Sequence, residues 1–274
     1  GGSFTGLAPS YQRQLLAAVH PYLEQGLVGS VRLSTRPDSI DGQTASFLRG
    51  HGVEVVELGV QSLDEKVLAM SRRGHSVASV AAAFGYLKEQ GLRVGGQLMI
   101  GLPGETTSSA LAGAQALARL GPDLVRIYPT LVIRGSDLAA LHAAGGYRPL
   151  SLLKAVALAG RLKEIFDRYR IPVVRMGLQP GPALERDLVA GPYHPAFGEL
   201  VLSRLLFKQV RALLAGLPAG AGARLAVAPA DQSILRGPGN RSLRRLEALG
   251  LARRLELVFD PAQPRHAVCL LDSP

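Results

Sequence analysis

Cysteine is almost absent from this sequence: Cys269 is the only one in 274 residues. A single thiol excludes an intramolecular disulfide and any metal cage built from cysteines of this chain alone, and it is typical of a reducing compartment. Long apolar runs are absent as well. The longest stretch without Asp, Glu, Lys or Arg is Thr106–Ala118, which is too short to span a bilayer. No signal peptide is visible. We therefore expect a cytoplasmic protein without a membrane-spanning segment.

Acidic residues are the scarcer of the two charge signs. There are 31 Lys and Arg against 21 Asp and Glu, which gives a net charge of +10. This surplus favours an anionic partner, RNA or DNA first. The alternative is a bias of composition, because most basic residues are Arg spread along a chain rich in Ala, Gly and Leu. The hydrophobic and charged fractions are those of a globular protein, and the length fits one large α/β domain with or without a small appendage.

Short β-branched runs alternate with longer stretches of helical pattern. Strands are expected at residues 27–34, 53–59, 93–101, 124–131 and 173–177, and helices near residues 10–25, 39–51, 63–70, 76–90, 106–120 and 151–170. This alternation is typical of βαβ units and a parallel sheet. Four consecutive units with similar strands favour an α/β fold of the full or partial (β/α) barrel kind over a doubly wound sheet.

Polar segments with Gly or Pro follow the expected strands. They read STRPD at 34–38, ELGVQS at 57–62, QLMIGLPGE at 97–105 and YPT at 128–130. Function in barrels lies at the carboxyl ends of the strands, so these segments predict a ligand site at one edge of the sheet. The opening Gly1, Gly2 and Ser3 would add free backbone donors there, although an ordinary strand-to-helix turn has the same composition.

The last third of the chain has a different pattern. A Gly/Pro/Ala linker at 216–223 is followed by an expected strand (224–228), helix (231–235), Gly-Pro-Gly-Asn turn, helix (241–249) and two strands (255–259 and 266–271). This order resembles the KH-type RNA-binding module, although Asn240 stands where that family usually has Gly. A structural tail with a glycine cap is the alternative.

Eight segments occurring in order resemble the radical S-adenosylmethionine (SAM) superfamily. They are GGSFTGL, STRPD, ELGVQS, RRGH, QLMIGLPGET, YPTLVIRG, MGLQP and GPYHPAFGEL, and they cover about residues 1–206. Within the superfamily they are similar to the Elongator catalytic-subunit-like branch, which is related to oxygen-independent coproporphyrinogen oxidases. The resemblance implies a partial TIM-like barrel of the radical SAM type at 1–206 that lacks its first strands. A helix end and linker (207–223) and a small α+β tail (224–274) would follow.

The resemblance also implies a SAM site. The implied SAM-binding residues are Gly1, Gly2 and Ser3 for the methionine amino group, Ser34 for the SAM moiety without a specified part, Gln61 and Arg73 for the methionine carboxylate and ribose, and Gln97 and Met99 for the ribose and adenine. Residues 101–104 would form the floor under adenine through their backbone. An Arg suits a carboxylate because it can pair with both oxygens. A solvated surface Arg73 and a core Met99 remain the alternatives.

A second set of residues would meet the substrate: His75, Tyr128 and Arg134. Imidazole exchanges protons near neutral pH, and a tyrosine offers a hydroxyl and a stacking face. Structural roles for these three residues are the alternative. His194, which lies between two prolines, is expected in a turn.

The family's [4Fe–4S] cluster is held by three closely spaced cysteines, which this chain does not contain. We expect these cysteines upstream of Gly1 in a longer protein, so the chain alone would be inactive. The Elongator acetyltransferase half is also missing, because Arg241 ends the nearest candidate for its R/Q-x-x-G-x-G/A loop. The expected function is a radical SAM enzyme, supplied by an electron donor, that modifies RNA, tRNA above all. The alternatives are an enzyme acting on a porphyrin or small metabolite, and a non-catalytic RNA-binding protein.

Overall fold

The computed structural model describes residues 3–217, 221–251 and 255–271. The predicted site residues Gly1 and Gly2 lie outside the described residues. The chain divides into two compact units, Gly1–Tyr193 and His194–Pro274. Among the described residues, no helix is long and apolar enough to cross a membrane.

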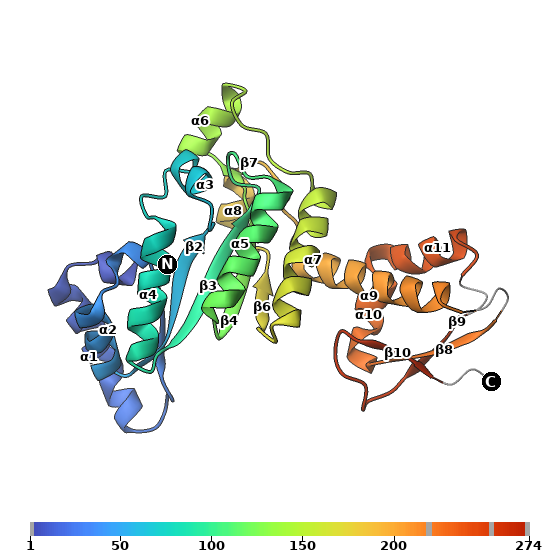
Figure 1. Ribbon diagram of the computed structural model, residues 1–274, viewed down its shortest axis with the longest axis horizontal. Coiled ribbons are helices and arrows are strands. Elements are labelled where there is room, and N and C mark those ends of the chain that lie inside the picture. Colours follow the sequence, from blue (N-terminus) through green and yellow to red (C-terminus); the bar gives the residue numbers. More distant parts are fainter. Residues whose placement is uncertain (1–2, 218–220, 252–254, 272–274) are drawn as a thin grey trace. The chain divides into compact units, whose positions relative to one another are not determined.

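The first unit is built on a five-stranded sheet (Figure 1). Its strands are β1 (Val31–Thr35), β2 (Val53–Gln61), β3 (Arg93–Ile100), β4 (Leu124–Pro129) and β6 (Val173–Met176). They are all parallel and stand in the order in which they occur in the chain, which confirms the predicted βαβ units. Sequential order is the arrangement of a (β/α) barrel, whereas a doubly wound sheet reverses direction.

Helices connect the strands of this sheet. They are α2 (Gly42–Gly50), α3 (Glu65–Met70), α4 (Val77–Glu89), α5 (Thr107–Leu120) and α7 (Leu152–Arg168), and a further helix, α1 (Pro9–Glu24), precedes β1. Helices α4, α5 and α7 contact β3 from one side of the sheet (Figure 1), as right-handed crossovers between parallel strands require. Polar side chains start them: Ser76 and Thr106 form capping boxes at α4 and α5. Gly96 lets α5 approach closely, because a Cβ there would lie 2.9 Å from a Leu117 methyl carbon.

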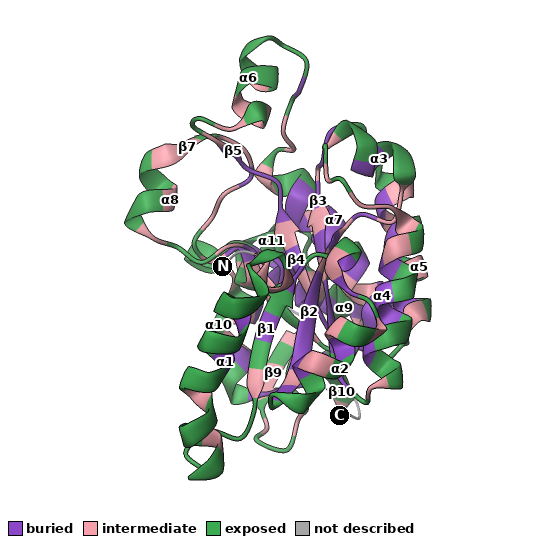
Figure 2. Ribbon diagram, turned by 90° about the vertical axis from the view of Figure 1, so that its left-hand side faces the viewer, coloured by how far each residue is buried: buried purple, intermediate pink, exposed green. Residues whose placement is uncertain are grey.

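The sequence did not predict a small extension of this unit. Two short antiparallel strands, β5 (Val132–Ile133) and β7 (Leu188–Ala190), pair with each other, and the helices α6 (Asp137–Ala143) and α8 (Pro182–Asp187) lie between them in the chain. Figure 2 shows these elements beyond the ends of the parallel strands, with mostly exposed residues on the two helices. Strands of two or three residues are too short for an alternating pattern to be visible in a sequence.

The second unit contains α9 (Phe197–Ala215) and a three-stranded sheet. The further elements are β8 (Ala223–Val227), α10 (Gln232–Arg236), α11 (Arg241–Ala248), β9 (Leu255–Phe259) and β10 (Val268–Leu271), with β8 in the centre. This is the strand–helix–turn–helix–strand–strand order expected for the tail. Leu206, Phe207, Val210 and Leu214 of α9 share a buried core with β8, so the contacts group α9 with the tail. The predicted end of the radical SAM barrel at residue 206 stays a prediction, and so does the RNA-binding role of the tail.

The turn between α10 and α11 depends on glycine. Gly237 has a φ of +69°, and a Cβ there would lie 2.8 Å from Ser203 Oγ and 2.9 Å from Ser242 Oγ. These two hydroxyls lie 3.1 Å apart in the core between α9 and α11. Any other residue at position 237 would be strained and would also push these helices apart.

Candidate functional site

The sheet of the first unit has one face toward the helices and one face away from them. Paired residues of parallel strands lie on the same face, and side chains alternate along each strand. The face away from the helices, called the inner face below, is polar. Next to the buried Val55 and Leu124, its side chains include Arg32 and Ser34 of β1, Glu57 of β2, Gln97 and Met99 of β3, Arg126 and Tyr128 of β4, and Arg175 of β6. The pairs Ser34–Glu57, Gln97–Arg126 and Arg126–Arg175 are neighbours in the register.

Glu57 is the centre of the inner face. Its side chain is only 3% exposed, and it forms ion pairs with Arg32 and with Arg126, the latter at 2.8 Å from Nε to Oε2. Gln97 Nε2 donates to Glu57 Oε2 at 3.0 Å and reaches Ser34 Oγ at 3.4 Å. One buried carboxylate therefore orients Gln97, which in turn contacts Ser34, and neutralises part of the positive charge around them.

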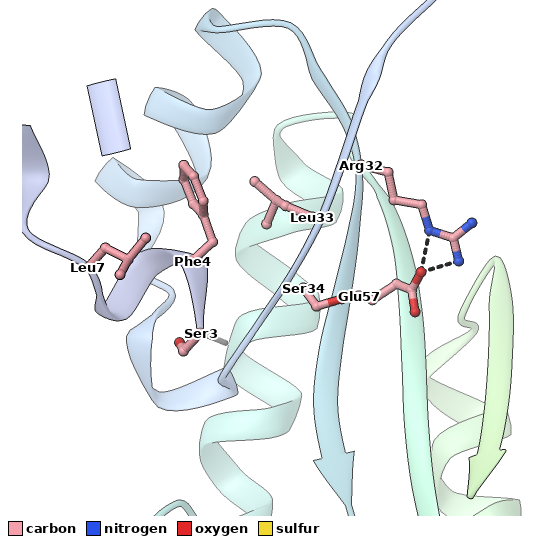
Figure 3. A pocket seen from close by; sticks show the side chains of 7 residues that line it. All are labelled: Ser3, Phe4, Leu7, Arg32, Leu33, Ser34 and Glu57. Carbon is pink, nitrogen blue, oxygen red and sulfur yellow. Dashed lines mark hydrogen bonds and ion pairs between the residues drawn. The ribbon is translucent and has the colours of Figure 1, made fainter. Parts of the chain in front are cut away.

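A cavity of about 510 Å³ opens beside β1 (Figure 3). It is lined by Ser3, Phe4, Leu7, Arg32, Leu33, Ser34 and Glu57. Ser3 Oγ lies 2.9 Å from Thr35 Oγ1 and accepts a hydrogen bond from the Arg36 backbone at 3.3 Å. These bonds hold the start of the described chain against the carboxyl end of β1, where the sequence analysis expected a ligand-binding turn.

Gln61 and Arg73 follow β2. Gln61 has a φ of +65°, and its amide nitrogen lies 2.8 Å from where a Cβ on Gly59 would be, so it folds over that glycine. Arg73 is half-buried, and its Nη2 lies 3.5 Å from Met99 Sδ. Burial lowers the pKa of Arg73, and the charge of nearby Arg36 lowers it further. Because Met99 is on the inner face, Arg73 joins Ser34 and Gln97 on the same side of the sheet.

The charge of Arg73 has no counter-ion among the residues that the structure describes. The neighbouring Arg36 already pairs with Asp38, through contacts of 2.9 and 2.7 Å, and this pairing lowers the pKa of Asp38. A half-buried guanidinium left without a carboxylate is costly and is suited to a bound anion.

The three residues predicted to meet the substrate are not brought together. Tyr128 is on the inner face, where its hydroxyl accepts from Arg126 Nη1 at 3.2 Å. His75 Nε2 lies 3.0 Å from the Val60 carbonyl oxygen, and its Nδ1 is buried with no partner among the described atoms. Arg134 is exposed on the connection after β5, and its backbone N–H donates to Asp187 at 2.7 Å. His194 accepts from the Ala196 backbone at 3.0 Å, which confirms its role in a turn.

The exit turn of β3 carries a carboxyl group that the sequence analysis placed in a motif but not in the site. Glu105 Oε2 accepts from the Gly101 N–H at 2.6 Å, and Tyr147 donates its hydroxyl to the Gly101 carbonyl at 2.6 Å. Burial raises the pKa of Glu105 to about 7. Burial and the nearby Glu105 raise the pKa of Tyr147 to about 12. Glu105 and Tyr147 therefore hold the turn at residues 101–104 from both sides.

Sequence reasoning missed Glu57, Arg32, Arg126 and Arg175 as members of the site. A signal was present, because each of these charged residues lies next to β-branched or other apolar residues within its strand. A charge inside a parallel strand is rarely buried without a partner. Such residues in four strands therefore indicate a common polar face.

The described part of the chain holds no cluster of three or more His, Cys, Asp or Glu side chains that could bind a metal ion. Cys269 is exposed and belongs to the second unit.

Comparison with known proteins agrees with this geometry. The model of the Radical SAM superfamily matches residues 3–112, and the model of the Radical_SAM C-terminal domain matches residues 122–206. The chain belongs to the radical SAM superfamily. The two matches together contain all five strands of the parallel sheet and the residues of the inner face. The resemblance to the radical SAM superfamily that the sequence motifs indicate is confirmed.

Within the superfamily the chain is similar to Elongator-type proteins. It is 33% identical over 140 residues to a tRNA uridine(34) acetyltransferase of Methanocaldococcus infernus, covering 50% of this chain and 26% of that protein. It is 28% identical over 218 residues to Elongator complex protein 3 of Homo sapiens, covering 69% of this chain and 40% of that protein. The chain thus spans less than half the length of these relatives.

A solved structure shares the fold. The Elp3 of Methanocaldococcus infernus with an N-terminal deletion superposes with a TM-score of 0.65 at 27% identity, covering 76% of this chain and 53% of that chain. This likeness confirms the predicted fold of the radical SAM type.

Proposed function

We propose that the inner face of the first unit binds SAM in a radical SAM enzyme that acts on RNA. The observation that carries this proposal is Arg73, a half-buried cation at the edge of the inner face with Met99 Sδ as its neighbour and no carboxylate partner in the described part of the chain. The carboxylate of an amino acid would supply the missing charge.

The residues around Arg73 fit the rest of SAM. Gln97 and Ser34 present an amide and a hydroxyl for the ribose hydroxyls, and Gln61 lies at the end of the neighbouring strand. The turn at residues 101–104, held by Glu105 and Tyr147, offers backbone groups to the adenine. Glu57 keeps Gln97 pointing across the inner face. SAM held there would supply radical chemistry only if a reduced [4Fe–4S] cluster stood beside it.

The residues of this chain do not fit the cluster itself. Three thiolates hold such a cluster, and Cys269 is the single cysteine of the sequence. The three ligands and an electron donor would have to come from outside this chain. The role that we propose for the chain is therefore to bind and orient SAM and the substrate.

RNA, tRNA first, is the substrate class that the charges favour. The net charge is +10, and in the second unit the helix α11 carries three arginines, Arg241, Arg244 and Arg245, in eight residues. The relative from Methanocaldococcus infernus is named for a tRNA uridine. The porphyrin alternative requires an apolar, tetrapyrrole-sized cavity, whereas the inner face carries mainly polar and charged side chains, among them three arginines and one glutamate.

The SAM proposal is tested by calorimetric titration of the full chain with SAM. Replacing Arg73 with Gln removes the charged hydrogen bonds to the carboxylate, and we expect the dissociation constant to rise by roughly 10- to 100-fold. Arg72→Gln is the matched control, because Arg72 is 82% exposed and pairs only loosely with Asp137, at 3.3 Å. Equal affinities of the two variants, or a wild-type chain that does not bind SAM, would refute the proposal.

A further inference from the structure

The charges of the inner face do not balance. Arg32, Arg126 and Arg175 carry three positive charges, and Glu57 is the one carboxylate that the described residues place among them. Glu57 forms ion pairs with Arg32 and Arg126. Arg175 instead donates to the Gly177 carbonyl at 3.3 Å and to Gln179 Oε1, which are both neutral.

Two of these arginines are direct neighbours. Arg126 of β4 and Arg175 of β6 stand opposite each other in the register, and like charges in that position destabilise a sheet. A sequence that keeps such a pair on a half-buried face accepts a cost in stability, and costs of this kind concentrate at functional sites. Tyr128 adds a hydroxyl beside Arg126 at 3.2 Å.

Guanidinium groups bind phosphate through charged N–H donors, and the described contacts of these two arginines involve Nε and Nη1 of Arg126 and Nε and Nη2 of Arg175, which leaves one Nη nitrogen of each for a ligand. We propose that Arg126 and Arg175 form a second anion site on the inner face, which binds a phosphate group of the substrate nucleotide. This inference rests on the proposed function for the nature of the substrate. The site is distinct from the cation expected to hold the SAM carboxylate, because Arg73 follows β2 and these two arginines are on β4 and β6.

The position of the site gives it a function. Strand β3, with Gln97 and Met99, lies between the proposed SAM residues of β1 and β2 and the two arginines of β4 and β6. A nucleotide held by its phosphate at Arg126 and Arg175 would lie on the same face of the sheet as SAM. The anion site would thereby fix the substrate within reach of the reaction, which is how binding groups away from the reacting atoms contribute to rate.

The probe is uridine 5′-monophosphate, with uridine as the ligand that lacks the phosphate, titrated into the full chain by NMR at low salt. We expect the wild-type chain to bind the monophosphate more tightly than uridine, and Arg175→Gln to weaken the monophosphate about tenfold or more. Arg175→Lys keeps the positive charge but lacks the planar guanidinium. We expect its affinity for the monophosphate to lie between those of the wild-type chain and Arg175→Gln. Arg119→Gln is the matched control, because Arg119 is exposed on α5 in the helix layer.

Equal weakening by Arg175→Gln and Arg119→Gln would overturn the inference, because net charge alone would then explain binding. Equal affinity of the wild-type chain for uridine and its monophosphate would overturn it as well. SAM titration of the same Arg175→Gln variant separates this inference from the proposed function. If Arg175→Gln binds SAM as the wild-type chain does but binds the monophosphate more weakly, the result supports both the SAM proposal and the anion site. Phosphate binding at Arg175 in a chain that does not bind SAM supports the anion site and refutes the SAM proposal.

Discussion

Glu57→Gln is expected to lower the free energy of unfolding of the first unit by about 3 kcal/mol. Removing one partner of a buried ion pair costs roughly 3–5 kcal/mol, and the lower end applies because the side chain of Arg32 is 41% exposed and partly screened by water. The variant leaves Arg32, Arg126 and Arg175 on one face without a carboxylate. Since the chain has no tryptophan, urea unfolding followed by circular dichroism is the suitable measurement.

Glu54→Gln is the control for this prediction. Glu54 is on the same strand, 43% exposed, and its pair with Arg93 is long, 3.7 Å. Exposed pairs of this kind contribute less than about 1 kcal/mol. We also expect Glu57→Gln to weaken SAM binding, because the Gln97 amide loses its charged acceptor. If the two variants unfold at the same urea concentration, Glu57 is not the centre of the inner face.

The second large effect concerns pH and Glu105. Burial raises the pKa of this carboxyl from 4.5 to about 7, so the folded chain holds the proton more tightly than the unfolded chain does. The contribution of Glu105 to stability is therefore complete below pH 4.5, falls as the pH rises from 4.5 to 7, and is lost above 7. A shift of this size corresponds to up to about 3 kcal/mol.

This prediction is measured by urea unfolding at about pH 5 and about pH 8, on either side of the raised pKa. The free energy of unfolding of the first unit should fall between about pH 5 and about pH 8 in the wild-type chain. In Glu105→Gln, whose side chain cannot ionise, this fall should be smaller by up to about 3 kcal/mol. Glu89→Gln is the control, because Glu89 is exposed at the end of α4. The same pH dependence in the wild-type chain and in Glu105→Gln would show that the carboxyl is not held in its protonated form.

The sequence carries much of this fold because the helices and parallel strands differ strongly in pattern. The β-branched runs of β2, β3 and β4 and the capping residues Ser76 and Thr106 mark their elements locally. Strand β1 begins at Val31 and not at Leu27, which is 67% exposed after α1. The extension with β5 and β7 depends on pairing between distant short segments, which leaves no local signal.

Some residues of the candidate site are predictable from the sequence, and others are found only from the structure. Ser34, Gln61, Arg73 and Gln97 are predicted from a family resemblance, and the structure brings Ser34, Arg73 and Gln97 to one face of the sheet. Gln61 ends the neighbouring strand β2 with its amide folded over Gly59. The binding of SAM by these residues stays a prediction. The sequence marks Glu57 as a charge inside a strand, but it does not identify the partners Arg32 and Arg126, because they are far from Glu57 in the chain and only the strand register brings them together.

The most direct test of SAM binding uses the three methionines, Met70, Met99 and Met176. In a chain labelled with ¹³C at the methionine methyl groups, each gives one NMR signal, assigned by single Met→Leu variants. Titration with SAM should move the Met99 signal saturably, because Met99 lies beside Arg73 on the inner face. The Met176 signal should stay in place, since its register partner Ile127 faces the helices. A Met99 signal that does not move at any SAM concentration would contradict the account.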